Sequence, residues 1–149
     1  MTVRQLFISV FLTLAVAAQA VALDAIYTPW NNNLAIRGYD PVAYFTENAA
    51  VEGSKQFEYE WQGADWRFSS EEHLNLFVSN PEMYAPQYGG YCAWAVAHGK
   101  TASIEPEQFS VIDGKLYLNY NAKIQEKWKV DTSKYIELAD ENWPKLLQE

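Results

Sequence analysis

Residues 57–84 read FEYEWQGADWRFSSEEHLNLFVSNPEMY, and this stretch decides the fold class. Aromatic residues alternate with glutamates at 57–61, and aromatic residues alternate again at Trp66 and Phe68 after the turn-forming residues 62–65. Successive side chains of a strand point to opposite faces of a sheet. The pattern therefore predicts a β-hairpin with one buried aromatic face.

A helix is predicted directly after this hairpin. Ser69 and Glu72 have the spacing of a capping box, and apolar residues recur at helical spacing within 74–78. The Asn-Pro pair at 80–81 ends the helix. A hairpin followed at once by a helix indicates a mixed α and β domain.

The C-terminal half repeats this mixture of elements. SVIDGKLYLNY at 110–120 predicts a second hairpin, because Asp113 and Gly114 favour a type I′ turn. Further helices are predicted at residues 91–98, 122–128 and 131–143. The expected fold class is therefore α+β: one small domain of two β-hairpins forming antiparallel sheet, packed with three to four short helices.

The segment before the first hairpin predicts turns. Residues 28–45 are rich in Asn, Gly and Pro, so we expect an extended arm that leads to a short strand or helical turn at 42–45. Asp40 and Pro41 predict a turn in which the Asp40 side chain bonds back to the chain.

The N-terminus has the layout of a secretory signal peptide. One arginine precedes an uncharged apolar run at 6–18, and small residues follow it. We expect a signal peptide at 1–22 and a mature domain at 23–149, located in the periplasm or secreted. No later stretch reaches the roughly 20 apolar residues of a transmembrane helix, so stable membrane insertion is not expected after the signal is removed.

Composition excludes several classes of partner. The chain has 19 acidic and 11 basic residues, a formal net charge of −8, whereas nucleic acid and anionic lipid require a basic surface. A single cysteine cannot form an internal disulfide, so stability must come from packing. The 6 Trp, 10 Tyr and 7 Phe are expected mainly in the core, and a surplus of Tyr and Trp could line a ligand pocket.

Several motifs in one order resemble a known family. They are GYDPVAYF at 38–45, the hairpin FEYEWQGADWRFSS at 57–70, EEHLNLFVSNPEMYAPQYGGYCA at 71–93, VIDGKLYLNY at 111–120 and ADENWP at 139–144. Together they resemble the exported YHS domain proteins of bacteria over nearly all of the mature chain. The resemblance implies a single YHS-type domain at 23–149.

This resemblance also implies metal binding by cysteines at the first turn and around the helix start. Ala43, Ser69 and His73 occupy the corresponding positions here, so the thiols on which such a site depends are missing. His73 is the one plausible ligand left among them, although its neighbours Glu71 and Glu72 indicate a solvated helical turn.

Three roles are open for Cys92, the sole cysteine. As a metal ligand it cannot act with His98 on one continuous helix, because residues six apart point to different faces. A metal site must therefore gather residues distant in sequence, and a soft donor set suits Cu(I) better than Zn(II). The candidate metal ligands are Cys92, His73, His98 and Met83.

The other two roles need no metal. At the first turn of a helix, the thiolate of Cys92 would be stabilised by free backbone N–H groups, which favours a redox thiol. The small apolar neighbours Ala95 and Val96 instead favour a buried packing residue. His98 is expected at the surface, where Trp94 shares its helical face at a spacing of four.

Motifs for hydrolytic, phosphate-binding or dinucleotide chemistry are missing from the sequence. We therefore expect a non-enzymatic function over an enzymatic one. The predicted function is an exported YHS-type binding module that handles a transition metal such as copper, with a metal ion or a periplasmic protein as its partner. The alternatives are a thiol redox protein that uses Cys92 as its catalytic nucleophile, and a structural interaction domain without a small ligand.

Overall fold

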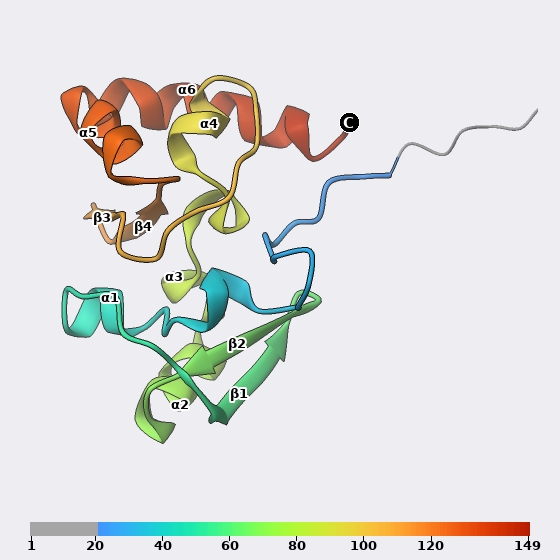
Figure 1. The fold of residues 1–149 in the computed structure, drawn as a ribbon, viewed down its shortest axis with the longest axis vertical. Helices are drawn as coiled ribbons and strands as arrows, with labels where there is room; N and C mark the ends of the chain where they lie inside the picture. Colours follow the sequence, from blue (N-terminus) through green and yellow to red (C-terminus); the bar gives the residue numbers. More distant parts are fainter. Residues whose placement is uncertain (1–20) are drawn as a thin grey trace, which may run out of the picture.

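The computed structural model describes residues 21–149. The predicted signal peptide at 1–22 therefore lies almost wholly outside the described residues and stays a prediction. In Figure 1, α1, α2, β1 and β2 gather at one end of the molecule, and α4, α5, α6, β3 and β4 gather at the other. Helix α3 lies between these two groups.

The first group contains the predicted aromatic hairpin and the helix that follows it. In β1–β2, Tyr59 pairs with Trp66 and Trp61 pairs with Ala64 in antiparallel register. The short helical turn expected near 42–45 is present as α1. The elements are η1 (Ala35–Gly38), α1 (Ala43–Thr46), β1 (Ser54–Trp61), β2 (Ala64–Phe68) and α2 (Glu71–Ser79), and α3 (Pro81–Tyr84) follows between the two groups.

The second group contains the other hairpin and the remaining helices. Asp113 and Gly114 have φ angles of 52° and 72°, as the predicted type I′ turn requires. Helix α4 packs against α6. The elements are η2 (Gln87–Gly90), α4 (Ala93–Ala97), β3 (Phe109–Ile112), β4 (Lys115–Leu118), α5 (Ala122–Val130) and α6 (Thr132–Leu146).

The fold has two hydrophobic cores, and the first of them extends from the first group of elements into α4 and β4 of the second. In the first core, the ring of Phe77 lies 5.0 Å from that of Trp66 and 5.2 Å from that of Phe68, and all three side chains are fully buried. In the second core, Trp128 is fully buried and its ring lies 5.5 Å from that of Tyr117. Burial of each such side chain stabilises the fold by about 2–3 kcal/mol.

The α+β class predicted from sequence is confirmed, with the two hairpins forming two separate two-stranded sheets. The predicted capping box is wrong in register: Ser70, not Ser69, caps α2 by accepting a hydrogen bond from the N–H of His73 at 3.1 Å. The helix predicted at 91–98 is shorter and begins after Cys92. Within residues 21–149, no helix has the length and apolar character needed to cross a membrane.

Candidate functional site

A buried carboxylate joins the first turn to helix α2. Asp40 is fully buried, and its Oδ1 accepts hydrogen bonds from the N–H groups of Val42 (2.8 Å) and Ala43 (3.3 Å), which confirms the predicted turn. Its Oδ2 accepts from the N–H (2.9 Å) and the hydroxyl (2.6 Å) of Ser69. Ala43 and Ser69 stand at two positions where the family resemblance implies metal-binding cysteines, and both donate hydrogen bonds to the Asp40 carboxylate.

His73 completes this cluster. Its Nδ1 donates to Oδ2 of Asp40 at 2.6 Å, and its Nε2 lies 3.3 Å from the hydroxyl oxygen of Thr46. The expectation that His73 is solvated is wrong, because it is only 9% exposed. Its polar atoms are satisfied inside the fold by partners from the first turn and from α1.

The order Thr46, His73, Asp40 resembles a hydrolytic triad, in which a carboxylate orients the imidazole that activates a hydroxyl. However, the hydroxyl of Thr46 also donates to the carbonyl of Val42 at 3.3 Å. A substrate would need a cavity beside this hydroxyl, and the cleft described below is lined by other residues. We therefore interpret the cluster as a tie between α1 and α2.

Cys92 lies in the first core and is 1% exposed. Its Sγ lies 3.5 Å from Oδ1 of Asn119, to which the thiol donates, and Asn119 in turn donates to Gln125 at 2.7 Å. Burial raises the pKa of the Cys92 thiol, and nearby backbone N–H groups only partly offset this effect. Of the three roles open for Cys92, this environment favours packing.

The remaining predicted ligands have separate surroundings. His98 is exposed, as expected, its Nδ1 donates to the carbonyl of Trp94 at 2.6 Å, and the two rings lie 3.9 Å apart on the helical face that they share. Met83, in α3, is 54% exposed. Within residues 21–149, no three His, Cys, Asp or Glu side chains gather closely enough to hold a metal ion. The copper site at Cys92, His73, His98 and Met83 stays a prediction.

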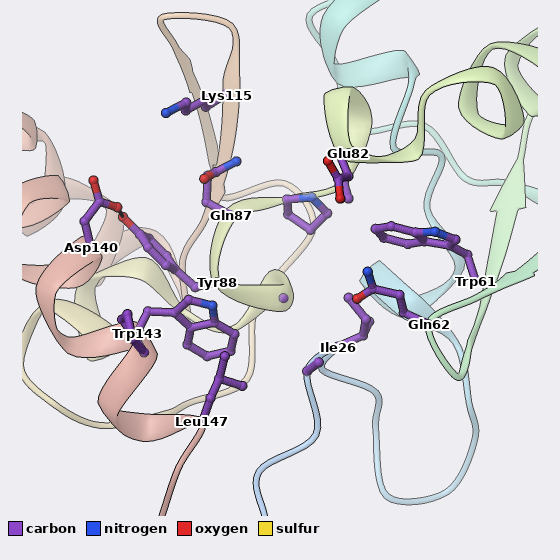
Figure 2. Close-up of a pocket in the computed structure, with 15 residues that line it drawn as sticks. Ile26, Trp61, Gln62, Glu82, Gln87, Tyr88, Lys115, Asp140, Trp143 and Leu147 are labelled. Carbon is purple, nitrogen blue, oxygen red and sulfur yellow. Dashed lines mark hydrogen bonds between the residues drawn. The ribbon is translucent and has the colours of Figure 1, made fainter.

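A cleft of about 620 Å³ lies between the two groups of elements. Figure 2 shows Trp61 and Gln62 on one side, and Tyr88, Asp140 and Trp143 on the other. Ile26 from the N-terminal segment lies between them, and Glu82 and Lys115 lie at the rim. The cleft therefore combines aromatic and apolar walls with a small number of charged groups.

Tyr88 is held in an unusual backbone conformation beside this cleft. Its φ angle is 57°, a left-handed conformation that costs a non-glycine residue about 1–3 kcal/mol. The hydroxyl of Tyr88 donates to Oδ1 of Asp140 at 2.7 Å. Burial is the main cause that raises the pKa of Tyr88 well above its usual value. The hydroxyl therefore stays protonated and holds the Asp140 carboxylate in place.

The N-terminal segment packs against η2, which contains Tyr88 and Gly89. A Cβ at Gly89 would lie 1.9 Å from the carbonyl oxygen of Ala25, so no larger residue fits without movement of the backbone. The N–H of Tyr27 donates to the carbonyl of Gly89 at 2.8 Å. These contacts position Ile26 in the cleft wall.

The sequence predicted only in general terms that surplus Tyr and Trp could line a pocket. The cleft residues come from segments far apart in the chain. The available signal for them was that Tyr88, Asp140 and Trp143 lie within two of the motifs that carry the family resemblance. None of these three was selected, because motif order does not indicate which distant segments meet.

Comparison with known families identifies a YHS domain at residues 42–88. The matched segment runs from the start of α1 to Tyr88, and it includes His73 and Met83 but ends before Cys92 and His98. Searches of curated proteins and of solved structures found no significant match. The expectation that one domain of this type extends over 23–149 stays a prediction.

Proposed function

We propose that this YHS domain-containing protein is a non-enzymatic binding module and that the cleft between its two groups of elements receives a small ligand. The observation that carries the proposal is the cleft itself. Its volume of about 620 Å³ lies within the range of about 300–1,000 Å³ found for small-molecule sites. Trp61, Tyr88 and Trp143 give it aromatic surface of the kind found in such sites, beside polar and charged side chains that could orient a ligand.

Two further observations support a binding role for the cleft. The left-handed conformation of Tyr88 is a local strain, and such strain concentrates at functional sites. The hydroxyl of Tyr88 also fixes the carboxylate of Asp140, so one polar group of the cleft is positioned before any ligand arrives. Preorganisation of this kind lowers the entropic cost of binding.

A fragment screen by NMR tests this proposal. Fragments added to ¹⁵N-labelled protein should shift the indole N–H signals of Trp61 and Trp143, assigned with the variants Trp61→Phe and Trp143→Phe. Trp30 is 98% exposed and outside the cleft, so its indole signal is an internal control. If every binding fragment shifts Trp30 and leaves both cleft indoles unchanged, the proposal is wrong.

Transition-metal handling is a second candidate, because a YHS domain is present and such domains are linked to metal handling. The proposed ligands remain Cys92, His73, His98 and Met83. For Cys92 to bind Cu(I), its segment must open, since the thiol is buried. Titration with Cu(I) in competition with a chelator should give weaker binding in Cys92→Ser than in the unmodified protein. Equal affinity in the two proteins would exclude a site based on Cys92.

We also propose that the protein is exported and acts in the periplasm or outside the cell. The support for this is the apolar N-terminal segment followed by small residues. Expression of the full chain in a bacterium, followed by cell fractionation and N-terminal sequencing, should yield a periplasmic or secreted product that begins near residue 23. A cytoplasmic product with an intact N-terminus would contradict this proposal.

A further inference from the structure

The two halves of the chain have the same order of elements. Each half begins with a 3₁₀ helix and a short α-helix, continues with a β-hairpin, and ends with two further helices. We call these halves the first unit (35–84, η1 to α3) and the second unit (87–146, η2 to α6). The family match at 42–88 lies almost wholly within the first unit. The shared order raises the question whether the second unit is a repeat of the first.

The backbone at the start of the two units has the same unusual geometry. Three consecutive residues of η1 have positive φ angles of 49°, 53° and 84°, and three of η2 have positive φ angles of 57°, 60° and 83°. A tyrosine follows each 3₁₀ helix, and the next residue donates its N–H to a carbonyl in the loop before the hairpin. These bonds join Asp40 to Val51 at 2.8 Å and Cys92 to Ala102 at 3.0 Å. Positive φ is uncommon outside glycine, so the shared run is a specific likeness.

From the hairpin onward, equivalent residues of the two units lie 51 positions apart in the sequence. Ser70 and Asn121 cap the first helix after each hairpin, and each side chain accepts a hydrogen bond from the N–H three residues later. Asn80 and Asp131 precede the second helix with nearly equal dihedral angles, φ −155° and ψ 75° against φ −156° and ψ 74°. The two helix pairs therefore begin at equivalent positions.

Each hairpin also packs one face on its own helix through an aromatic pair. The rings of Trp66 and Phe77 lie 5.0 Å apart at an interplanar angle of 33°. The rings of Tyr117 and Trp128, at the equivalent positions, lie 5.5 Å apart at 39°. The two units are thus alike in element order, in backbone geometry and in the position of their central aromatic contact.

The outer faces of the two hairpins, which point away from these aromatic pairs, differ in chemistry. The outer face of the second hairpin is apolar and packs on the first core: Phe109, Val111, Leu116 and Leu118. The equivalent positions of the first hairpin, in the same cross-strand register, are all charged: Glu58, Glu60, Asp65 and Arg67. Leu116 and Leu118 are fully buried, whereas Asp65 and Arg67 are partly exposed.

The apolar outer face of the second hairpin forms the interface between the units. The ring of Phe109 lies 4.9 Å from that of Tyr44 in α1, and the hydroxyl of Tyr44 donates to the carbonyl of Pro106 at 2.8 Å. In Figure 1, β3 and β4 accordingly lie between α1 and α6. In the second unit, α6 covers α4, the counterpart of α1, and Asn142 of α6 donates to two carbonyls of α4 at 3.1 Å. The stack of units therefore ends at α6.

We infer that the chain is a stack of two equivalent units, of which the second is a diverged YHS-type repeat, and that the charged outer face of the first hairpin closes the other end of the stack. Stacked repeats require polar outer faces at their ends, because an exposed apolar face associates with other copies. This inference concerns the architecture and association of the protein, and it does not depend on the ligand cleft proposed above.

The double variant Asp65→Leu with Arg67→Leu tests the closing role of this face. It gives the first hairpin the side chains of the second at equivalent positions, so we expect it to fold, with a urea midpoint within about 0.5 M of the unmodified protein. Its apolar face should promote self-association. Sedimentation equilibrium at the highest concentration used should give an average mass at least about 1.5 times that of the unmodified protein.

The matched control is Lys123→Leu with Glu126→Leu on α5. It also replaces one acidic and one basic residue, and both positions are more exposed than Asp65 and Arg67, so it adds at least as much apolar surface. We expect its average mass to equal that of the unmodified protein. Equal masses for the hairpin variant and the unmodified protein, or equal association of the hairpin variant and the control, would overturn the closing role. Failure of the hairpin variant to fold would overturn the equivalence of the hairpins.

Exchange of the aromatic pair tests the equivalence of the units directly. Trp66→Tyr with Phe77→Trp gives the first unit the pair of the second. Phe77→Trp alone overpacks the first core, and the smaller ring at 66 offsets this, so the double variant should lower the urea midpoint less than Phe77→Trp alone. A midpoint of the double variant at or below that of Phe77→Trp would show that the two pairs are not equivalent.

Discussion

Replacement of Asp40 by asparagine tests whether one buried carboxylate ties α1 to α2. In Asp40→Asn, Oδ1 can still accept from Val42 and Ala43, but an NH₂ group replaces Oδ2. The hydroxyl of Ser69 and the imidazole of His73 can reorient toward this donor, whereas the backbone N–H of Ser69 cannot and loses its acceptor. A buried N–H without a partner costs about 1–3 kcal/mol, and a hydrogen bond to a charged group is also lost. We expect the free energy of unfolding to fall by about 2–3 kcal/mol.

Urea denaturation followed by tryptophan fluorescence measures this loss. Asp131→Asn is the matched control: Asp131 caps α6 at the surface by accepting from the N–H of Lys134 at 3.2 Å, and asparagine caps a helix about equally well. The control should change stability by less than about 0.5 kcal/mol. A loss in Asp40→Asn no larger than that of the control would refute the proposed tie.

Three further predictions follow from the buried side chains. Alkylation of Cys92 by iodoacetamide should be slow at pH 8.5 in the native protein and fast in urea, since burial disfavours the thiolate. Fast labelling of the native protein, with a rate that reaches half its maximum below about pH 8.5, would instead support the redox alternative. The free energy of unfolding should fall as pH rises above about 8.5, and more steeply above about 10. The reason is that burial raises the pKa of Cys92, Tyr44 and Tyr88, so these groups ionise at lower pH in the unfolded chain than in the folded one. Each group then lowers the free energy of unfolding by about 1.4 kcal/mol per pH unit. Equal stability in urea titrations at pH 8, 9.5 and 11 would contradict this. Phe77→Ala should cost about 3–5 kcal/mol in the same urea assay, because it removes a ring in contact with Trp66, and a cost under about 1 kcal/mol would mean that the first core is not as tightly packed as described.

Local sequence patterns predicted local structure well. The alternating aromatic residues gave the first hairpin, and Asp113 with Gly114 gave the second, because both signals depend only on neighbouring residues. The turn at Asp40 was predicted for the same reason, and the spacing of four between Trp94 and His98 indicated the shared helical face on which their rings meet.

The environments of His73 and Cys92 depend on residues distant in sequence. The glutamates beside His73 indicated a solvated helical turn, but its main partner, Asp40, lies 33 residues earlier. The thiol of Cys92 is paired with Asn119, which is 27 residues later. The helix predicted around Cys92 begins one residue after it, so the thiol enters the first core instead of lying on an accessible first turn.

The cleft could not be predicted for a related reason. Its walls come from β1, η2 and α6, and from the N-terminal segment that crosses Gly89. Trp61 belongs to an alternating pattern that indicates a buried strand face, yet it packs against the edge of the first core and is only partly buried, so it also lines the cleft. Only the packing of the two groups of elements determines which aromatic side chains stay open to a ligand.

Intermolecular nuclear Overhauser effects test the binding function of the cleft most directly. They are measured on protein saturated with the tightest-binding fragment of the screen. We predict contacts from the bound molecule to the indole protons of Trp61 or Trp143, because both side chains line the cleft, on opposite sides of it. Contacts confined to Trp30 or Trp94, with none to the cleft indoles, would contradict a ligand site at this position.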